Sequence, residues 1–147
     1  MHQFSNILVV CTGNICRSPM AAALLEKELD SSRHTIVSAG VEALVGEPAD
    51  PLAIEVMRDN RIDITGHRAR QLIQPMLAEA DLIFALDQGH ARAITTRFPQ
   101  YYGKAFKLGH WNGNADVADP YRRPKQNFEQ AFAEISAHVA AWKRRLS

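Results

Sequence analysis

The chain has 147 residues, with 17 Lys or Arg, 16 Asp or Glu and a formal net charge of +1. This length predicts a single domain over residues 1–147, with a core that needs neither disulfides nor metal, and the near-neutral charge gives no reason to expect a nucleic-acid partner. The N-terminus has no charged region followed by a long apolar core, so no signal peptide is expected, and no apolar run approaches the ~20 residues of a membrane span. We therefore expect a soluble cytoplasmic protein without membrane insertion, either a monomer or a weak oligomer.

The pattern of apolar residues predicts alternating strands and helices. Strands are expected at 4–10, 35–38, 82–86 and 105–108, and helices at 18–29, 51–60, 88–97 and 127–146, with a short helical turn from Pro75. No regular spacing of apolar residues is found in segments 41–50, 62–70 and 109–125, which are therefore expected to be connections. The last segment is long for a connection, which suggests that it has a function. Strands alternating with helices predict an α/β fold in three layers, a four-stranded parallel sheet with helices on both faces. Ligands bind at the carboxyl ends of such strands.

The segment that joins the first strand to the first helix is predicted to bind an anion. Cys11 ends the apolar run, and Ser18 and Pro19 open the helix, where Ser18 can serve as its cap and Pro19 suits the first turn. The amides between them can turn inward as a nest, to which the helix adds its positive end. The predicted phosphate-binding residues of this loop are Thr12, Gly13, Asn14, Ile15, Cys16, Arg17 and Ser18.

The same loop carries a nucleophile and a cation. Arg17 can hold two anionic oxygens with its planar fork, and the field of the loop favours the thiolate of Cys11 near neutral pH. Gly13 is expected to relieve a positive φ, which Asn14 also tolerates. A cysteine that ends a buried strand is often only a small core residue, but the strand before C-x5-R, the Gly-Asn inside it and the Ser-Pro after it favour phosphoryl transfer.

Two motifs resemble one enzyme family. The segment CTGNICRSP resembles the signature loop of the low-molecular-weight protein tyrosine phosphatases, and DPYRRP at 119–124 resembles their acid loop. Their order and spacing agree, so the resemblance covers essentially the whole chain. Three segments around these motifs look most like the bacterial branch associated with exopolysaccharide and capsule export. They are NILVVCTGNICRSP, SAGVEALVGEPADP and LGHWNG. The resemblance implies a phosphotyrosine phosphatase without metal or organic cofactor, whose partner is a phosphotyrosyl protein such as a tyrosine autokinase of polysaccharide export.

A cysteine phosphatase needs a proton donor for its leaving oxygen. From the residues alone, Asp119 followed by proline is more often a turn initiator, but the resemblance assigns Asp119 as the general acid. Asp116 is the nearest alternative, and Asp50 and Asp87 are weaker ones. The resemblance gives Asp87 a structural role.

Further residues are expected to support the loop. Ser18 can donate to the departing thiolate of Cys11, and Asn14 in a strained conformation needs partners for its side chain. By resemblance, Ser38 and His67 match the residues that hydrogen-bond this asparagine. The other histidines, at 2, 34, 90, 110 and 138, fall at no metal-ligand spacing, so no metal site is expected.

The walls of the pocket are assigned by resemblance to Leu44, from the loop after the second strand, and to Tyr121, which could pack on a substrate ring. Eukaryotic members tend to place an aromatic residue in the first wall and another after Tyr121, where this chain has Leu44 and Arg122. A peptide preference copied from the eukaryotic enzymes is therefore not expected.

The thiol of Cys16 has no part in this chemistry, although the residue belongs to the predicted phosphate-binding loop. It could capture oxidised Cys11 as a disulfide and protect it from over-oxidation, or it could be only a small buried residue. The expected redox test is recovery of peroxide-treated protein by a thiol reductant, which Cys16→Ser should lose.

Two other functions stay open. One is an arsenate reductase on the same scaffold, although the thiol-relay kind needs cysteines further downstream and none follows Cys16. The other is a carrier that forms a stable phosphocysteine on Cys11, which would not need Asp119.

Overall fold

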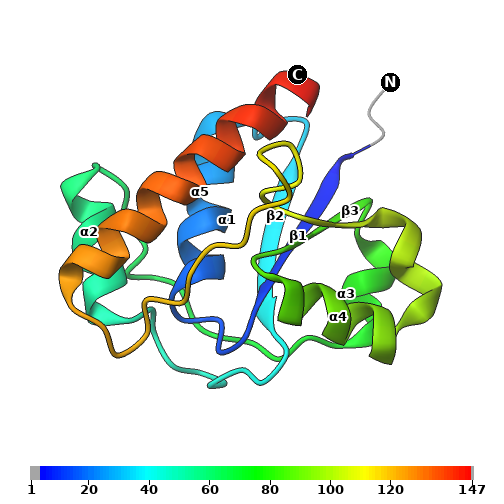
Figure 1. Ribbon diagram of the computed structural model, residues 1–147, viewed down its shortest axis with the longest axis horizontal. Helices are drawn as coiled ribbons and strands as arrows, with labels where there is room; N and C mark the ends of the chain where they lie inside the picture. The colour runs from blue at the N-terminus through cyan, green and yellow to red at the C-terminus, as the bar shows by residue number, and fades with distance from the viewer. Residues whose placement is uncertain (1–3, 147) are drawn as a thin grey trace.

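The computed structural model describes residues 4–146 and has strands and helices in alternation along the chain (Figure 1). The strands are β1 (Asn6–Cys11), β2 (Thr35–Gly40), β3 (Leu82–Ala85) and β4 (Ala105–Lys107). The helices are α1 (Arg17–Glu28), α2 (Pro51–Asp59), α3 (Gln74–Glu79), α4 (Gln88–Arg97) and α5 (Lys125–Leu146), with a 3-10 helix η1 (Pro99–Lys104). The strands and α-helices expected from the sequence are confirmed, close to their expected bounds.

The strands form one parallel sheet in the order β2-β1-β3-β4. The chain leaves β1 toward β2 on one side and returns to β3 on the other, so neighbouring connections diverge at the carboxyl ends of β1 and β3. Such a switch point is where parallel sheets bind their ligands. Cys11 is the last residue of β1 and therefore lies at this point.

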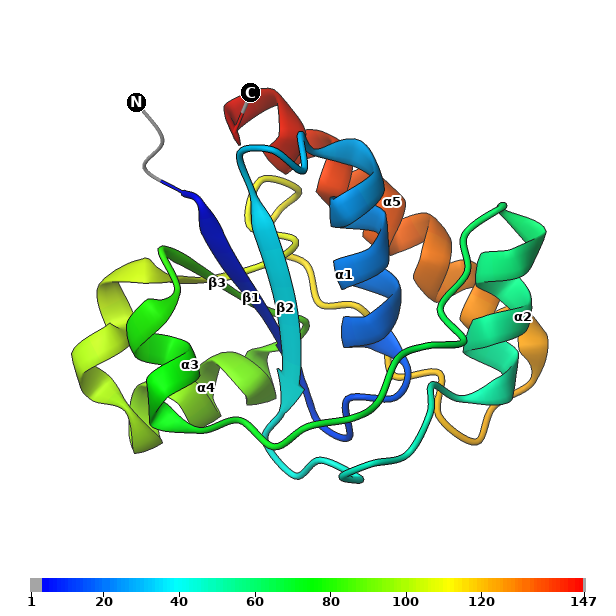
Figure 2. The ribbon, with the colours of Figure 1, turned by 180° about the vertical axis from the view of Figure 1, so that it is seen from behind.

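The residues of β1 face two layers of helices in alternation, as the period of a strand requires. Ile7 and Val9 belong to the core on the side of α1, α2 and α5, and Leu8 and Val10 belong to the core on the side of α3 and α4. All four are fully buried. Figures 1 and 2 show the helices on the two faces of the sheet and confirm the predicted three layers.

The long helix α5 packs along α1 on one of these faces. The side chains of Phe128, Ile135 and Val139 are buried, as their helical spacing predicts, and Trp142 donates from Nε1 to the carbonyl of Leu108 at 2.8 Å. Burying apolar side chains of this size stabilises the fold by roughly 1.5–3 kcal/mol each. Within residues 4–146, no helix is both long and apolar enough to cross a membrane.

One short element was missed and one local prediction was wrong. The sequence predicted no element at 99–104, where η1 forms because Pro99 occupies the first turn of a new helical segment. Ser18 does not cap α1, which begins at Arg17 and has no side-chain cap. The hydroxyl of Ser18 is engaged inside the loop instead, where it meets Cys11 and Asn14.

Candidate active site

Cys11 lies at the bottom of a pocket at the end of β1, beneath the loop that leads into α1. Its side chain is buried, and its Sγ lies 2.8 Å from Oγ of Ser18. Burial is the largest effect on the thiol and raises its pKa, while the Ser18 hydroxyl, the charge of Arg17 and the backbone N–H groups of Ser18 and Asn14 lower it. The sequence predicted only the effects that lower the pKa of Cys11. The net direction in the structure is upward, because burial at the bottom of the pocket removes most of the water that would stabilise the thiolate.

Asn14 organises the loop above the sulfur. Its φ is +62°, a conformation that asparagine tolerates better than most residues. Its Nδ2 donates to Oγ of Ser18 at 2.7 Å and to Oγ of Ser38 at 3.0 Å, and its Oδ1 accepts from the backbone N–H of Arg70 at 2.9 Å. Nε2 of His67 lies 2.7 Å from the carbonyl oxygen of Asn14. Since a carbonyl only accepts, His67 donates there, and burial lowers its pKa and favours the neutral ring.

The positive φ of the loop falls on Asn14 alone, so the role expected for Gly13 was wrong: this glycine has no positive φ, and a Cβ on it would meet Ile15 and Leu44 only at ordinary contact distances. The glycine that the loop requires is Gly40, at the end of β2. A Cβ there would lie 2.4 Å from the carbonyl oxygen of Thr12. The sequence analysis missed this residue, because its partner is a backbone atom far away in the chain.

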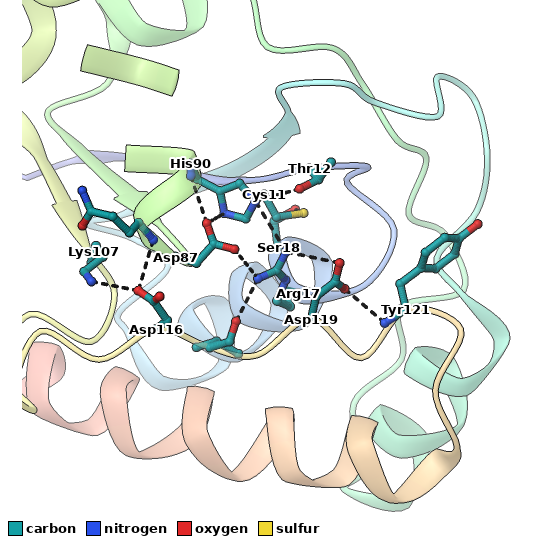
Figure 3. Close-up of polar contacts among 12 residues, drawn as sticks. Cys11, Thr12, Arg17, Ser18, Asp87, His90, Lys107, Asp116, Asp119 and Tyr121 are labelled. Atoms are coloured by element: carbon teal, nitrogen blue, oxygen red, sulfur yellow. Dashed lines mark hydrogen bonds and ion pairs between the residues drawn. The ribbon is translucent and has the colours of Figure 1, made fainter. Parts of the chain in front are cut away.

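Arg17 is held at the edge of the pocket with its side chain buried (Figure 3). Its Nη1 donates to Oδ2 of Asp87 at 2.8 Å and to the carbonyl of Val117 at 2.8 Å. Burial would raise the pKa of Asp87, but the hydrogen bonds from Arg17 and from the backbone N–H of His90 outweigh it and hold the pKa below its usual range. Asp87 thus supports the arginine, as the resemblance implied.

Asp119 lies beside Arg17, with its Oδ2 3.6 Å from Nη2. Its side chain is 51% exposed, so a proton can pass between it and a substrate or water. Its Oδ1 accepts from the backbone N–H of Tyr121 at 3.1 Å. The alternative acid, Asp116, is paired with Lys107 at 2.8 Å and accepts from the backbone N–H of Gln88 at 3.1 Å. Of the two carboxylates, only that of Asp119 lines the pocket.

The predicted wall residues Leu44 and Tyr121 come from separate loops and line the pocket together with Ile15. Both predicted walls are partly exposed, and both face the pocket of Cys11. The full lining consists of Cys11, Thr12, Gly13, Ile15, Cys16, Arg17, Glu42, Leu44, Asp119 and Tyr121. The pocket thus combines apolar side chains, those of Ile15, Leu44 and Tyr121, with the charged side chains of Arg17, Glu42 and Asp119.

Cys16 also borders the pocket and is buried, and both cysteines are free thiols. Burial raises its pKa, and the charges of Asp50, Cys11 and Asp119 add to this effect, while Arg17 opposes it. Burial raises the pKa of both thiols, so burial does not tell them apart. Cys11 differs in its partners, because the Ser18 hydroxyl lies 2.8 Å from its Sγ and backbone N–H groups of Ser18 and Asn14 also stabilise its thiolate.

His90 is a site residue that the sequence analysis missed. It is buried at the start of α4, and its Nε2 lies 2.8 Å from Oγ1 of Thr12 (Figure 3). One feature of the sequence could have indicated a role for His90. It lies three residues after Asp87, just beyond the carboxyl end of β3, where a parallel sheet binds its ligands.

Comparison with known proteins agrees with this geometry. The family model "Low molecular weight phosphotyrosine protein phosphatase" matches residues 6–147. The chain belongs to this family. A probable low molecular weight protein-tyrosine-phosphatase, EpsP, from Ralstonia nicotianae is 47% identical over 140 residues, which cover 95% of this chain and 94% of the relative.

Solved structures extend the comparison to three dimensions. Vibrio vulnificus Wzb in complex with benzylphosphonate superposes with a TM-score of 0.93 at 40% identity, over 97% of this chain and 99% of that one. The YwlE arginine phosphatase from Geobacillus stearothermophilus superposes with a TM-score of 0.90 at 36% identity, over 97% and 92% of the two chains. EpsP and Wzb confirm the bacterial branch that the flanking segments indicated.

Proposed function

We propose that the protein hydrolyses phosphotyrosine in other proteins through a cysteinyl phosphate. The observation that carries this proposal is the convergence of three groups on one pocket: the Sγ of Cys11, the guanidinium of Arg17 and the carboxylate of Asp119. They supply a nucleophile, a clamp for anionic oxygens and a proton donor, which together are sufficient for transfer of a phosphoryl group.

In the first step, the Cys11 thiol gives its proton to an oxygen of the bound phosphoryl dianion, helped by the Ser18 hydroxyl and the charge of Arg17, which stabilise the thiolate. The thiolate attacks the phosphorus, so that an S–P bond forms as the P–O bond to the phenol breaks. The loop amides and the guanidinium of Arg17 hold the remaining phosphoryl oxygens, where charge is concentrated in the transition state. Asp119 gives its proton to the phenolic oxygen, which leaves as a neutral phenol.

In the second step, the carboxylate of Asp119 takes a proton from water, and the resulting hydroxide attacks the phosphorus. The S–P bond breaks and its electron pair returns to Cys11. The hydroxyl of Ser18, 2.8 Å from the sulfur, can donate to the departing thiolate and make it a better leaving group. Inorganic phosphate is released.

The walls of the pocket favour an aromatic substrate. Ile15, Leu44 and Tyr121 present apolar surface beside the loop, which suits the phenyl ring of phosphotyrosine. Benzylphosphonate, the molecule in the Vibrio vulnificus Wzb complex, joins a phenyl ring to a phosphonate in the same way. Phosphoarginine is the second candidate, because Glu42 also lines the pocket and could face a guanidinium.

As the natural substrate we propose a tyrosine autokinase of polysaccharide export, in the cytoplasm. The bacterial branch shared with EpsP and Wzb supports this assignment. A cytoplasmic site also suits a mechanism that depends on a reduced thiol at Cys11. An arsenate reductase is not favoured, because the chain has no cysteine after Cys16 to relay a disulfide.

The test compares two peptides of identical sequence, one with phosphotyrosine and one with phosphoarginine, in the presence of EDTA. We expect hydrolysis of the phosphotyrosyl peptide, with activity unaffected by the chelator. Cys11→Ser should abolish turnover, and Asp119→Ala should lower kcat by about 10²–10⁴-fold with a smaller change in KM. Turnover by Cys11→Ser, loss of activity in EDTA or a preference for phosphoarginine would each contradict the proposal.

A further inference from the structure

We propose that His90 is a positioning residue of this active site, which fixes the Thr12 hydroxyl and the Arg17 guanidinium through Nε2 of its ring while Asp87 sets the tautomer. The kinetic part of this inference rests on the proposed function. The tautomer and anion binding do not depend on turnover and test it separately.

The ring of His90 lies among three polar groups, two from the loop after β1 and one from the turn that opens α4 (Figure 3). Its Nε2 is 2.8 Å from Oγ1 of Thr12 and 3.5 Å from Nη2 of Arg17. Its Nδ1 is 3.3 Å from Oδ1 of Asp87 and makes no hydrogen bond with any of the described residues. The backbone N–H of His90 donates to the same Oδ1 at 2.9 Å, which places the ring and the carboxylate on one turn at the start of α4.

These neighbours decide which nitrogen carries the proton. The Thr12 hydroxyl can donate to Nε2 or accept from it, so it fits either tautomer. A guanidinium can only donate, so a proton on Nε2 would face the N–H of Arg17, whereas a bare Nε2 can accept from it. The nearest group to Nδ1 is the carboxylate of Asp87 at 3.3 Å, which can only accept and whose negative charge favours a proton on Nδ1 even without a hydrogen bond. The favoured ring is therefore neutral, with the proton on Nδ1, and Nε2 accepts from the hydroxyl of Thr12 and faces Arg17.

The carboxylate, the imidazole and the hydroxyl follow the same order as a hydrolytic triad, but the ring is a poor base. Burial and the charge of Arg17 lower the pKa of His90 to about 4, against the opposing charges of Asp87, Asp119 and Asp116. Such a ring cannot take the proton of an alcohol at neutral pH, so Thr12 is not activated as a nucleophile. The arrangement holds groups in place.

What His90 holds is the geometry of the phosphoryl site. Nη1 of Arg17 is already occupied by Asp87 and the carbonyl of Val117, which leaves Nη2 and Nε for two anionic oxygens. The imidazole Nε2 lies against Nη2 and limits rotation of the guanidinium. The plane of the guanidinium is therefore fixed with its free N–H groups facing the pocket. The bond to Thr12 ties the first residue of the loop to the same ring, so that His90 links both ends of the loop.

Three variants test this role. His90→Phe keeps a planar ring but removes the acceptor, His90→Gln places an amide oxygen near the position of Nε2, and Thr12→Val removes the hydroxyl while keeping its shape. We expect His90→Phe to raise the inhibition constant of inorganic phosphate and to lower kcat/KM on p-nitrophenyl phosphate by roughly tenfold or more. His90→Gln should recover most of this loss, and Thr12→Val should reproduce part of it. His34→Phe, at the opposite end of the sheet, is the matched control.

The tautomer is measured on the unmodified protein. Nitrogen-15 NMR of the histidine rings should show the His90 proton on Nδ1 at pH 7. A proton on Nε2, or phosphate inhibition in His90→Phe equal to that of the wild type, would overturn the inference. Equal losses of kcat/KM in His90→Gln and His90→Phe would also overturn it. If His90 only filled space, the acceptor that Gln supplies and Phe lacks would make no difference to the activity. Wild-type protein that binds phosphate without turning over substrate would count against the proposed function alone.

Discussion

Arg17 is the residue at which the contacts of the site converge. Its guanidinium is buried, and burying a charge is costly unless the charge is paired and hydrogen-bonded. Asp87 supplies the opposite charge and Val117 supplies a carbonyl, both at 2.8 Å. Because these bonds occupy one nitrogen of the fork, the positive charge is oriented before any substrate binds. That preorganisation is what electrostatic stabilisation of a transition state requires.

Residue chemistry explains which parts of this site could be predicted from the sequence. Asn14 was expected to take a positive φ from its type, and it does, whereas Gly13 in the same turn does not. His90 could not be predicted, because its partner Thr12 lies 78 residues earlier in the chain and only the tertiary fold brings them together. A single histidine in a sequence is more often a surface or core residue than a site residue.

At the scale of this residue, His90 also makes stability depend on pH. Its pKa is about 4 in the folded protein, against about 6.5 in an unfolded chain. Below the unfolded value the unfolded chain binds a proton that the folded protein does not. The free energy of unfolding should therefore fall as pH drops from about 6.5 to about 4, by on the order of 3 kcal/mol from this residue. His67 and His138, whose pKa values burial also lowers, act in the same direction.

Urea unfolding of wild type, His90→Gln and the control His34→Gln across this range measures the effect. His90→Gln has no titrating ring, so its free energy of unfolding should fall less steeply than that of wild type, while His34→Gln should follow wild type. Parallel curves for wild type and His90→Gln would show that the ring does not titrate as described.

At the scale of elements, the end of β2 supports the catalytic loop. Gly40 pairs with Cys11 in the register of the sheet, and the loop lies directly over it. A Cβ at Gly40 would meet the carbonyl oxygen of Thr12 at 2.4 Å and the backbone nitrogen of Asn14 at 3.1 Å. These are backbone atoms and cannot rotate away, so an added methyl group must displace the loop.

Gly40→Ala should therefore lower kcat/KM by roughly a hundredfold, since a displacement of about 1 Å in an active site has an effect of that size. Gly103→Ala is the matched control, because a Cβ at Gly103 would meet no atom within 4 Å and its φ is not positive. The measurement is steady-state hydrolysis of p-nitrophenyl phosphate. Wild-type activity in Gly40→Ala would show that the loop does not depend on the close approach of β2.

The elements themselves were predictable because each has a strong local signal. The apolar runs at 6–11 and 82–85 gave buried strands, and α4 has the bounds expected from its flanking residues. The segment 99–104 was missed because Pro99 both ends one helix and starts another, and a proline alone does not distinguish the two. The cap predicted at Ser18 failed because its hydroxyl has stronger partners in the loop.

At the scale of the whole molecule, the site is assembled from segments that follow different strands. Cys11 and its loop follow β1, Leu44 follows β2, Asp87 and His90 follow β3, and Asp119 lies on the connection after β4. The parallel sheet brings these segments to one edge, as its topology requires. The sequence predicted that edge but not the strand order β2-β1-β3-β4, since several orders satisfy the same alternation of strands and helices.

The central claim is that Cys11 forms a transient phosphoryl intermediate that Asp119 helps to hydrolyse. The most direct measurement is mass spectrometry of Asp119→Ala mixed with p-nitrophenyl phosphate, quenched in milliseconds and digested. The account predicts a phosphoryl group on Cys11 that accumulates in this variant, decays with its turnover, and is absent from Cys11→Ser. A phosphoryl group on Thr12, or none on any residue during turnover, would contradict it. A phosphocysteine that persists in wild type without release of phosphate would identify a carrier instead.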